Sequence, residues 1–100
     1  MTVKLMMTWD MLPGREQEYF EFVVREFLPG MPALGLETSD AWLTMYGRHP
    51  QIATAAQMPS LAEMQRVLDS TEWQSLVNRL LDFVEHYDYK IIEARAGFQM

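Results

Sequence analysis

The stretch Val3–Leu28, VKLMMTWDMLPGREQEYFEFVVREFL, decides the fold because its hydrophobic period changes once along its length. Over Val3–Asp10 the side chains alternate as in a β-strand, and neither alternating set is uniformly polar, which predicts a strand covered on both faces. Pro13-Gly14 ends the alternation. Apolar residues then recur at helical spacing over Tyr19–Leu28. The stretch therefore predicts a strand followed by an amphipathic helix.

The apolar stripe of this first helix is expected to face a sheet, and it consists of Tyr19, Phe20, Val23, Val24 and Phe27. Phe22 lies off the stripe, so it is expected to be either a rim contact or exposed aromatic, or a contact in a dimer. Because proline removes a helical hydrogen bond, Pro29-Gly30 and Pro32 are expected to break the helix.

Two strand-like stretches follow, over about Glu37–Tyr46 and Gln51–Met58. Gly47–Pro50 between them is a turn by composition, so the two strands should form a hairpin. The side chains of Gln51–Met58 are small and mixed in character. They leave space above the sheet either for a closely packed helix or for a cavity.

The second helical pattern runs from Ser60 to Tyr87 and contains two start signals. Ser60 and Glu63 have capping-box spacing, and Asp69–Glu72 is a second start. We therefore expect a short helix over Leu61–Leu68 and a main helix from about Thr71. The stripe of the main helix, which should face the sheet, consists of Trp73, Leu76, Val77, Leu80, Leu81 and Val84.

A last strand is expected over Tyr89–Ala96. The complete order is then strand, helix, strand, strand, helix, strand, a doubled β-α-β unit. This order predicts an α+β, ferredoxin-like fold, a four-stranded antiparallel sheet with its helices on one face. The 100 residues are expected to form a single domain, residues 1–100.

Composition limits the classes of partner. The formal net charge is −6, from 14 acidic and 8 basic residues, and no basic cluster offsets it, so nucleic acid is not expected to bind. Without cysteine, the chain has no disulfide, thiolate nucleophile or sulfur-ligated zinc. No apolar run resembles a signal peptide or approaches the ~20 residues of a membrane span, so we expect a soluble, cytoplasmic protein without a membrane partner.

No motif in the sequence indicates a metal or a cofactor, and neither is expected. His86 falls nearly opposite the apolar stripe of the main helix, which predicts a solvent-facing side chain near the helix end. A haem ligand or a general base at His86 would need that helix face to line a cavity. His49 lies beside Arg48 in the hairpin turn, either as an ordinary surface residue or as part of a cationic pair that grips an anionic group.

The aromatic side chains are the better guide to a ligand. Large aromatics with polar tips can line a pocket for a planar apolar molecule, or they can form the core of a small protein. The candidate ligand-binding residues are Tyr19, Trp42, Tyr46, Arg48 and His49. In this hypothesis the three aromatics bind the apolar part of the ligand, and Arg48 or His49 holds its polar end. Trp73 is expected in the core.

Thr8–Gly14, TWDMLPG, closes a strand on an aromatic residue and leads into Pro-Gly, and Glu72-Trp73 opens the main helix. Together with the order of elements, these features resemble the dimeric α/β-barrel proteins, in their NIPSNAP-like and antibiotic-biosynthesis-monooxygenase-like (ABM-like) branches. The resemblance covers essentially the whole chain. It implies a ferredoxin-like monomer whose sheet pairs face to face with a second copy in a homodimer. An uncovered sheet face with apolar residues supports the same expectation.

The functions of those proteins are diverse, and no catalytic residue is carried over to this chain. Haem-degrading members use an asparagine on the first strand and a helix histidine, whereas the only asparagine here is Asn78, in the main helix. Two hypotheses follow. The protein binds or oxidises a small planar or apolar molecule in a cleft between helices and sheet, as a cofactor-independent monooxygenase would, or it is a non-catalytic, stress-associated or ligand-binding homodimer.

Overall fold

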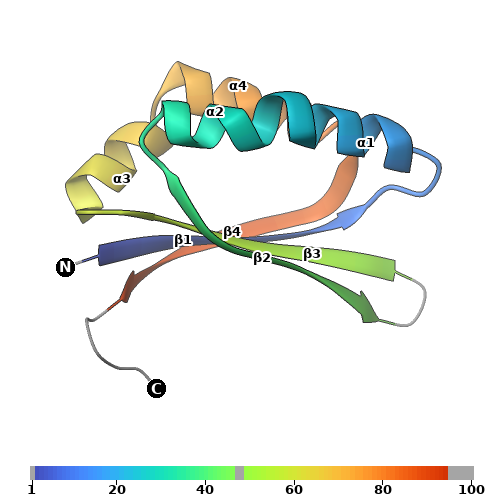
Figure 1. The fold of residues 1–100 in the computed structure, drawn as a ribbon, viewed down its shortest axis with the longest axis horizontal. Helices are drawn as coiled ribbons and strands as arrows, with labels where there is room; N and C mark the ends of the chain where they lie inside the picture. The colour runs from blue at the N-terminus through green and yellow to red at the C-terminus, as the bar shows by residue number, and fades with distance from the viewer. Residues whose placement is uncertain (1, 47–48, 95–100) are drawn as a thin grey trace.

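A computed structural model describes the backbone of residues 2–46 and 49–94 and the side chains of residues 2–38 and 51–93. The molecule has two layers, a sheet and a set of helices that cover one of its faces (Figure 1). In chain order the elements are β1 (Thr2–Met11), α1 (Glu16–Phe22), a π-helical turn η1 (Val23–Phe27), α2 (Leu28–Ala33), β2 (Glu37–Tyr46), β3 (His49–Met58), α3 (Leu61–Leu68), α4 (Thr71–Leu80) and β4 (Val84–Ala94). This order confirms the predicted α+β, ferredoxin-like fold.

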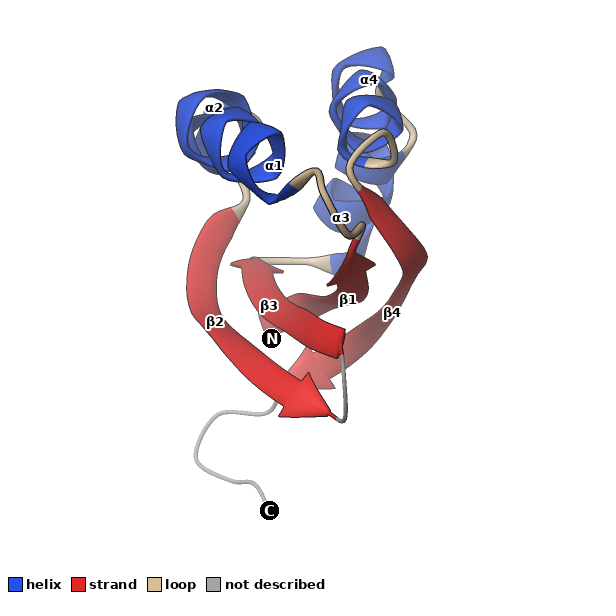
Figure 2. Cartoon of the chain, turned by 90° about the vertical axis from the view of Figure 1, so that its right-hand side faces the viewer, coloured by secondary structure: helices blue, strands red, loops and turns tan. Residues whose placement is uncertain are grey.

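The four strands lie in the order β2-β3-β1-β4, and every neighbouring pair is antiparallel. The helices lie above the sheet and its other face is left without helices (Figure 2). Alternate residues of central strand β1 are buried under the helices, namely Val3, Leu5, Met7, Trp9 and Met11. The side chains between them, from Thr2 to Asp10, point to the face without helices and are half-buried.

The first helix does not end at its prolines, contrary to the prediction. In η1, Leu28 N–H donates to the Val23 carbonyl, five residues back, immediately before Pro29. A proline ring clashes with the carbonyl four residues earlier in a regular α-helix, and the wider turn relieves that clash. The helix instead ends at Ala33, and Gly35, which has a φ of 93°, begins the return of the chain to β2. Gly35 N–H donates to the Pro32 carbonyl and Leu36 N–H to the Met31 carbonyl, as in a Schellman motif.

The buried face of the first helix is also rotated from the predicted stripe. Phe20 and Val24 are exposed, whereas Phe22 is buried. Phe22 packs against Phe83 at 5.6 Å between ring centroids, so it is neither a rim residue nor an exposed dimer contact. The rotation arises because this helix packs against α4 as well as against the sheet, and the guanidinium of Arg79 on α4 lies over the Phe22 ring.

Both predicted starts of the second helical region are confirmed. Ser60 and Ser70 accept hydrogen bonds from Glu63 N–H and Trp73 N–H, and helices α3 and α4 begin at the next residues, Leu61 and Thr71. The prediction that helix continues to Tyr87 is wrong. Tight turns end α4 at Leu80, and Val84, which fits the helical stripe by position, is instead buried by pairing with Met11 in the sheet.

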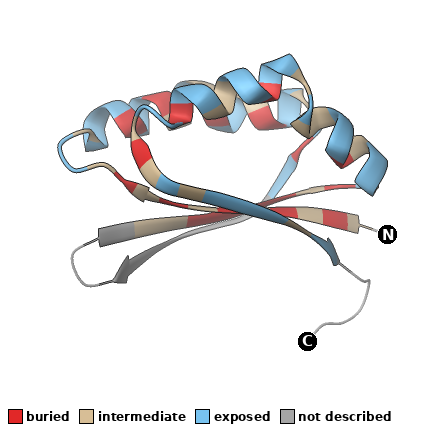
Figure 3. Ribbon diagram, turned by 180° about the vertical axis from the view of Figure 1, so that it is seen from behind, coloured by how far each residue is buried: buried red, intermediate tan, exposed pale blue. Residues whose placement is uncertain are grey.

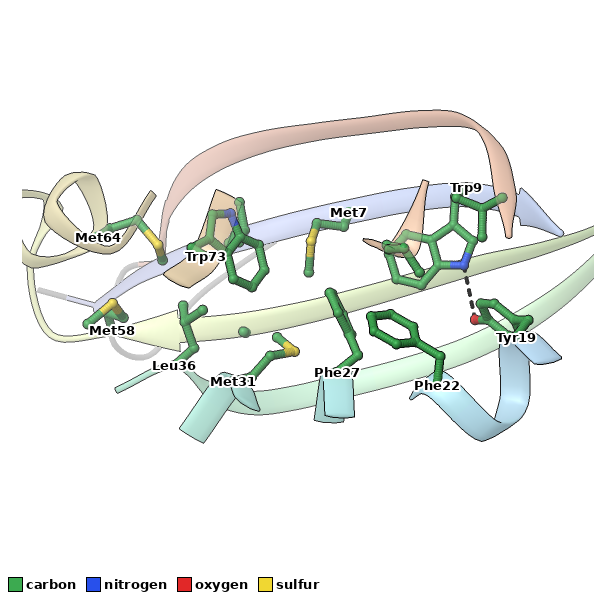
Figure 4. Close-up of a cluster of buried hydrophobic side chains, with 14 of the residues drawn as sticks. Met7, Trp9, Tyr19, Phe22, Phe27, Met31, Leu36, Met58, Met64 and Trp73 are labelled. Atoms are coloured by element: carbon green, nitrogen blue, oxygen red, sulfur yellow. Dashed lines mark hydrogen bonds between the residues drawn. The ribbon is translucent and has the colours of Figure 1, made fainter. Parts of the chain in front are cut away.

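The core lies between the helices and the sheet, as the burial colouring shows (Figure 3). In Figure 4 its side chains form a continuous row along the sheet, which includes Met7, Phe27, Met31, Leu36, Met58, Met64 and Trp73. The small residues of β3 are buried; Ala56 belongs to this core. None of the helices in the described part of the chain is both long and apolar enough to cross a membrane.

Candidate functional site

A cavity of about 320 Å³ lies between α4 and β4 at one edge of the molecule. Its wall comes from the end of α3, from one face of α4 and from β4, through Leu68, Trp73, Gln74, Val77, Asn78, Tyr87 and Tyr89. The cavity is therefore bounded by helix on one side and by sheet on the other. Its volume is at the lower end of the range for small-molecule sites, which begins at about 300 Å³.

A β-bulge in β4 turns two tyrosines towards this cavity. Register pairs Met11 with Val84 and Thr8 with Asp88, so that both His86 and Tyr87 lie opposite Trp9. The extra residue switches the alternation of the strand. Even-numbered Val84 faces the helices before the bulge, and odd-numbered residues, Tyr87 among them, face the helices after it.

The wall of the cavity is held by a set of ring contacts. Tyr87 stacks on the buried Trp9 with 6.1 Å between ring centroids and 23° between planes. Tyr89 packs on Tyr87 at 6.3 Å. Trp73 is 4% exposed and packs on Phe27 at 5.8 Å, so it forms part of the core, as predicted, and of the cavity wall as well. Three aromatic rings thus present their surfaces to one small volume.

The hydroxyl of Tyr87 stays protonated over the physiological range. Burial, followed by the neighbouring Tyr89 and Asp88, raises the pKa of Tyr87 to about 12. A protonated phenol donates and accepts hydrogen bonds, and so do the side-chain amides of Gln74 and Asn78 on the facing helix. Among the described residues that line the cavity, none carries a charge at neutral pH.

Tyr19, a predicted ligand-binding residue, lies in the core. Its ring is 3% exposed, and its hydroxyl accepts a hydrogen bond of 3.0 Å from Trp9 Nε1 (Figure 4). Burial raises the pKa of the Tyr19 hydroxyl, and the hydrogen bond from Trp9 opposes this shift. Tyr19 does not line the cavity, but it fixes the indole on which Tyr87 stacks.

The side chains of the other predicted site residues, Trp42, Tyr46, Arg48 and His49, lie outside the described residues. The backbone register pairs Trp42 with Ala53 and Tyr46 with His49 on β2 and β3. Strand β2 is at the opposite edge of the sheet from β4, three strand spacings or about 14 Å away. Within one subunit, residues of β2 therefore belong to a different part of the sheet from the cavity.

His86 lies on β4 and not on a helix, which corrects the prediction for this residue. It is exposed, as expected, but its φ of 57° is in the left-handed region, and its Nδ1 lies 2.9 Å from Asp10 Oδ2. Its side chain does not line the cavity. Across the described residues, no group of three or more histidines, aspartates or glutamates could hold a metal ion.

A second hollow, of about 530 Å³, lies between α2 and α4 on the helical layer. Its wall contains no aromatic residue; it consists of Gly30, Ala33, Leu34, Thr71, Glu72, Ser75 and Leu76. The cavity between α4 and β4 is the better candidate because aromatic surface and hydrogen-bonding groups converge on it.

The sequence pattern does not predict this cavity, because the helical period extends as far as Tyr87. The available signal is the alternation of Tyr87, Tyr89 and Ile91, which is typical of a strand and begins two residues before the predicted one. Asn78 is the only asparagine in the sequence, but its position in the sequence does not mark it as a cavity residue.

No protein-family model matches the chain, and no curated protein matches it. Solved structures do match over nearly all of its length. A NIPSNAP family protein from Agrobacterium tumefaciens is 20% identical, with a TM-score of 0.75, over 97% of this chain and 89% of that chain. A dimeric protein of unknown function and ferredoxin-like fold from Bacteroides fragilis is 17% identical, with a TM-score of 0.66, over 93% of this chain and 96% of that chain.

SnoaB, a cofactor-independent oxygenase from Streptomyces nogalater, has the same fold. The matching structure is that of a SnoaB mutant, which is 12% identical to this chain, with a TM-score of 0.66, over 99% of this chain and 98% of that chain. At these identities the likeness establishes the fold. It confirms that the structural neighbours of this chain are NIPSNAP family, dimeric α/β-barrel and ABM-like proteins, as the resemblance of Thr8–Gly14 indicated.

Proposed function

We propose that this protein is a homodimer that binds a small, neutral, planar molecule in the cavity between α4 and β4. The observation that carries the proposal is the cavity wall, in which the rings of Trp73, Tyr87 and Tyr89 face the amides of Gln74 and Asn78. Aromatic rings favour a flat apolar ligand, and amides and phenols match a carbonyl or hydroxyl on its edge. An uncharged wall offers no ion pair to an ionised ligand, so the preferred ligand is neutral.

Oxidation of the bound molecule is a second candidate, supported by the shared fold of SnoaB. If such an oxidation required removal of a proton from the substrate, the cavity would have to supply a general base with a pKa near the working pH. The Tyr87 hydroxyl, with its pKa near 12, is a hydrogen-bond donor at neutral pH and a poor base. Because Tyr87 is suited to donate a hydrogen bond and not to remove a proton, binding is the primary proposal and oxidation the second.

The binding proposal is tested with 2-naphthol, a neutral bicyclic phenol, titrated into the wild-type protein by calorimetry. We expect saturable binding with one site per chain. Tyr89→Ala and Asn78→Ala should each weaken binding roughly tenfold, the loss expected for one stacking or hydrogen-bonding contact.

Two matched controls separate the cavity from general effects. Phe20 is 51% exposed and Tyr89 52%, so Phe20→Ala removes an equally exposed aromatic outside the cavity. Gln65→Ala removes an exposed amide from α3, as Asn78→Ala does from α4. Equal losses in the controls and the cavity variants, or no saturable binding, would contradict the proposal. Oxygen consumption in the same mixture distinguishes oxidation from binding.

Trp42, Tyr46, Arg48 and His49 stay proposed ligand contacts. Trp42→Ala and His49→Ala in the same titration test them. A loss comparable with that of Tyr89→Ala would support a ligand that reaches both sheet edges, and unchanged binding would remove these residues from the site.

The proposal of a homodimer is supported by the face of the sheet that lacks helices (Figure 1). This face carries the half-buried side chain of Met6 on β1 and the side chain of Ile92 on β4, which is 40% exposed. Such a surface is favourable to cover, and the Bacteroides fragilis protein of the same fold is dimeric. Light scattering of the wild-type protein should give twice the chain mass of 11.7 kDa. Met6→Glu, which adds a charge to the centre of the face, should give the chain mass.

A further inference from the structure

The hollow between α2 and α4 is a second place at which a small molecule can bind. Its volume, about 530 Å³, exceeds that of the cavity between α4 and β4. The two helices lie beside each other in the outer layer of the molecule (Figure 2). The hollow and the cavity share no residue, and they use opposite flanks of α4. A ligand in the hollow is therefore independent of the one proposed for the cavity.

The hollow has an apolar floor and a polar rim. The side chains of Leu34 and Leu76 are partly buried and pack against the core, so they form the floor. Gly30 adds to the depth of the hollow because it places no side chain over Leu76. The rim on the α4 side consists of exposed polar residues, Thr71, Glu72 and Ser75.

The electrostatics of the rim favour a cation. Glu72 is the only charged residue of the wall, and it forms no ion pair within the described part of the chain. On the α2 side the wall is the last turn of the helix that runs without interruption from Glu16 to Ala33. The end of a helix carries about half a negative charge. The similar positive charge at the start of α4 offsets only part of these two contributions.

An apolar floor below a negative rim matches an amphipathic cation. We propose that the hollow binds a primary alkylammonium ion, with its hydrocarbon tail against Leu34 and Leu76 and its ammonium group beside Glu72. An ammonium group has three N–H donors, which suit the Glu72 carboxylate and the hydroxyls of Thr71 and Ser75. A carboxylate in place of the ammonium would be repelled by Glu72, and an alcohol would lack the ionic contact.

The arrangement of floor and rim also favours a free amine over the lysine side chain of another protein. The tail enters the hollow first and the ammonium group stays at the rim. A lysine has its ammonium group at the free end and its backbone at the other, so its backbone would have to occupy the hollow. The ligand is therefore a free alkylamine.

The proposal is tested with hexylamine, which is protonated at neutral pH, titrated into the ¹⁵N-labelled wild-type protein. The backbone amides of Gly30, Ala33, Leu34 and Leu76 should shift in a saturable way. Affinity should rise roughly threefold for each methylene from butylamine to hexylamine, because each is buried on the floor. Hexanol should bind more weakly than hexylamine, and hexanoate more weakly still.

Two variants locate the head and the tail. Glu72→Gln should weaken hexylamine binding roughly two- to fivefold, the range expected for an exposed ion pair, and should leave hexanol binding unchanged. Glu16→Gln is the matched control, because Glu16 is also an exposed glutamate in the first turn of a helix but lies outside the hollow. Ser75→Phe fills the hollow from an exposed position and should abolish the binding of both ligands.

Each result decides for or against the proposal. Absence of saturable shifts, or equal affinities for hexylamine, hexanol and hexanoate, would overturn it. Equal losses of hexylamine binding in Glu72→Gln and Glu16→Gln would show that only the net charge of the protein matters. Acetyl-lysine methylamide tests the direction of entry: if it binds as tightly as butylamine, the tail does not enter first. None of these results depends on whether 2-naphthol binds in the cavity between α4 and β4.

Discussion

At the scale of single residues, His86 has a backbone conformation that its side chain does not favour. A φ of 57° costs an ordinary residue about 1–2 kcal/mol relative to glycine. The exposed contact with Asp10 offsets little of this cost, because solvent screens it. We expect His86→Gly to be more stable than His86→Ala by about 1 kcal/mol in urea unfolding, since both lose the contact and only glycine relieves the strain. Equal stabilities would show that the bulge relaxes around alanine.

The hydrogen bond between Trp9 and Tyr19 is the second feature at this scale. Tyr19→Phe keeps the ring and removes the acceptor, so the buried indole N–H loses its partner. We expect a loss of about 1–3 kcal/mol in the free energy of unfolding. Tyr89→Phe removes a half-exposed hydroxyl and is the control, with an expected change below about 0.5 kcal/mol. A similar loss in both variants would mean that the hydrogen bond has no special role.

The titration of Tyr87 predicts a loss of stability at alkaline pH. Burial raises its folded pKa to about 12, above the ordinary value of 10.0. The contribution of the neutral phenol is therefore complete below pH 10 and is lost as the pH rises towards 12. Phenolate absorbance should show a late titration that Tyr87→Phe removes. The free energy of unfolding of the variant should fall less over this window than that of the wild type.

At the scale of elements, Gly30 of α2 lies against the side chain of Leu76 on α4. A Cβ at Gly30 would lie 2.7 Å from Leu76 Cδ1. We expect Gly30→Ala to destabilise the protein by about 1–2 kcal/mol through this overlap. In a Leu76→Ala background the overlap is gone, and the helix propensity of alanine should stabilise the protein by up to about 1 kcal/mol. A double-mutant cycle by urea unfolding measures this change of sign, and additive effects would refute it.

Elements with local signals were predictable from the sequence. Ser60 and Ser70 cap helices through bonds to residues three positions on, so the starts of α3 and α4 were evident from the spacing alone. The end of the first helix was not predictable in this way. Whether Pro29 ends a helix depends on a widened turn before it, and the packing of Phe22 against Phe83, far along the chain, decides which face is buried.

The candidate site was harder to predict than the fold, because it depends on one bulge. A single extra residue opposite Trp9 turns Tyr87 and Tyr89 towards α4. Because of it, Val84 before the bulge and the odd-numbered residues after the bulge face the same side of the sheet, so the strand does not alternate regularly along its whole length. Nothing in the composition of residues 84–89 marks that extra residue, since His86 stands where a glycine is usual. Sequence patterns predict that a strand exists more readily than they predict which way its side chains face.

At the scale of the whole molecule, the proposed dimer predicts a melting temperature that depends on protein concentration. A dimer that unfolds to separate chains gains about 1.4 kcal/mol for each tenfold increase in concentration. For two chains of 100 residues this should raise the melting temperature by about 3–5 °C. Calorimetry at two concentrations measures the shift. Met6→Glu, as a monomer, should show none, and a wild-type protein without a shift would argue against coupled assembly and folding.

The sheet order also has a consequence for the synthesis of the chain. Strand β1 is synthesised before both of its neighbours, β3 and β4, and β4 is the last of the described elements to be made. At about 5–20 residues per second, the roughly eighty residues that separate β1 from its last partner take several seconds to appear. During that interval Leu5, Met7 and Trp9 have no completed sheet to join. The apolar residues of β1 are therefore uncovered on the nascent chain until β4 has been made. A chaperone would bind the chain most readily at this stage.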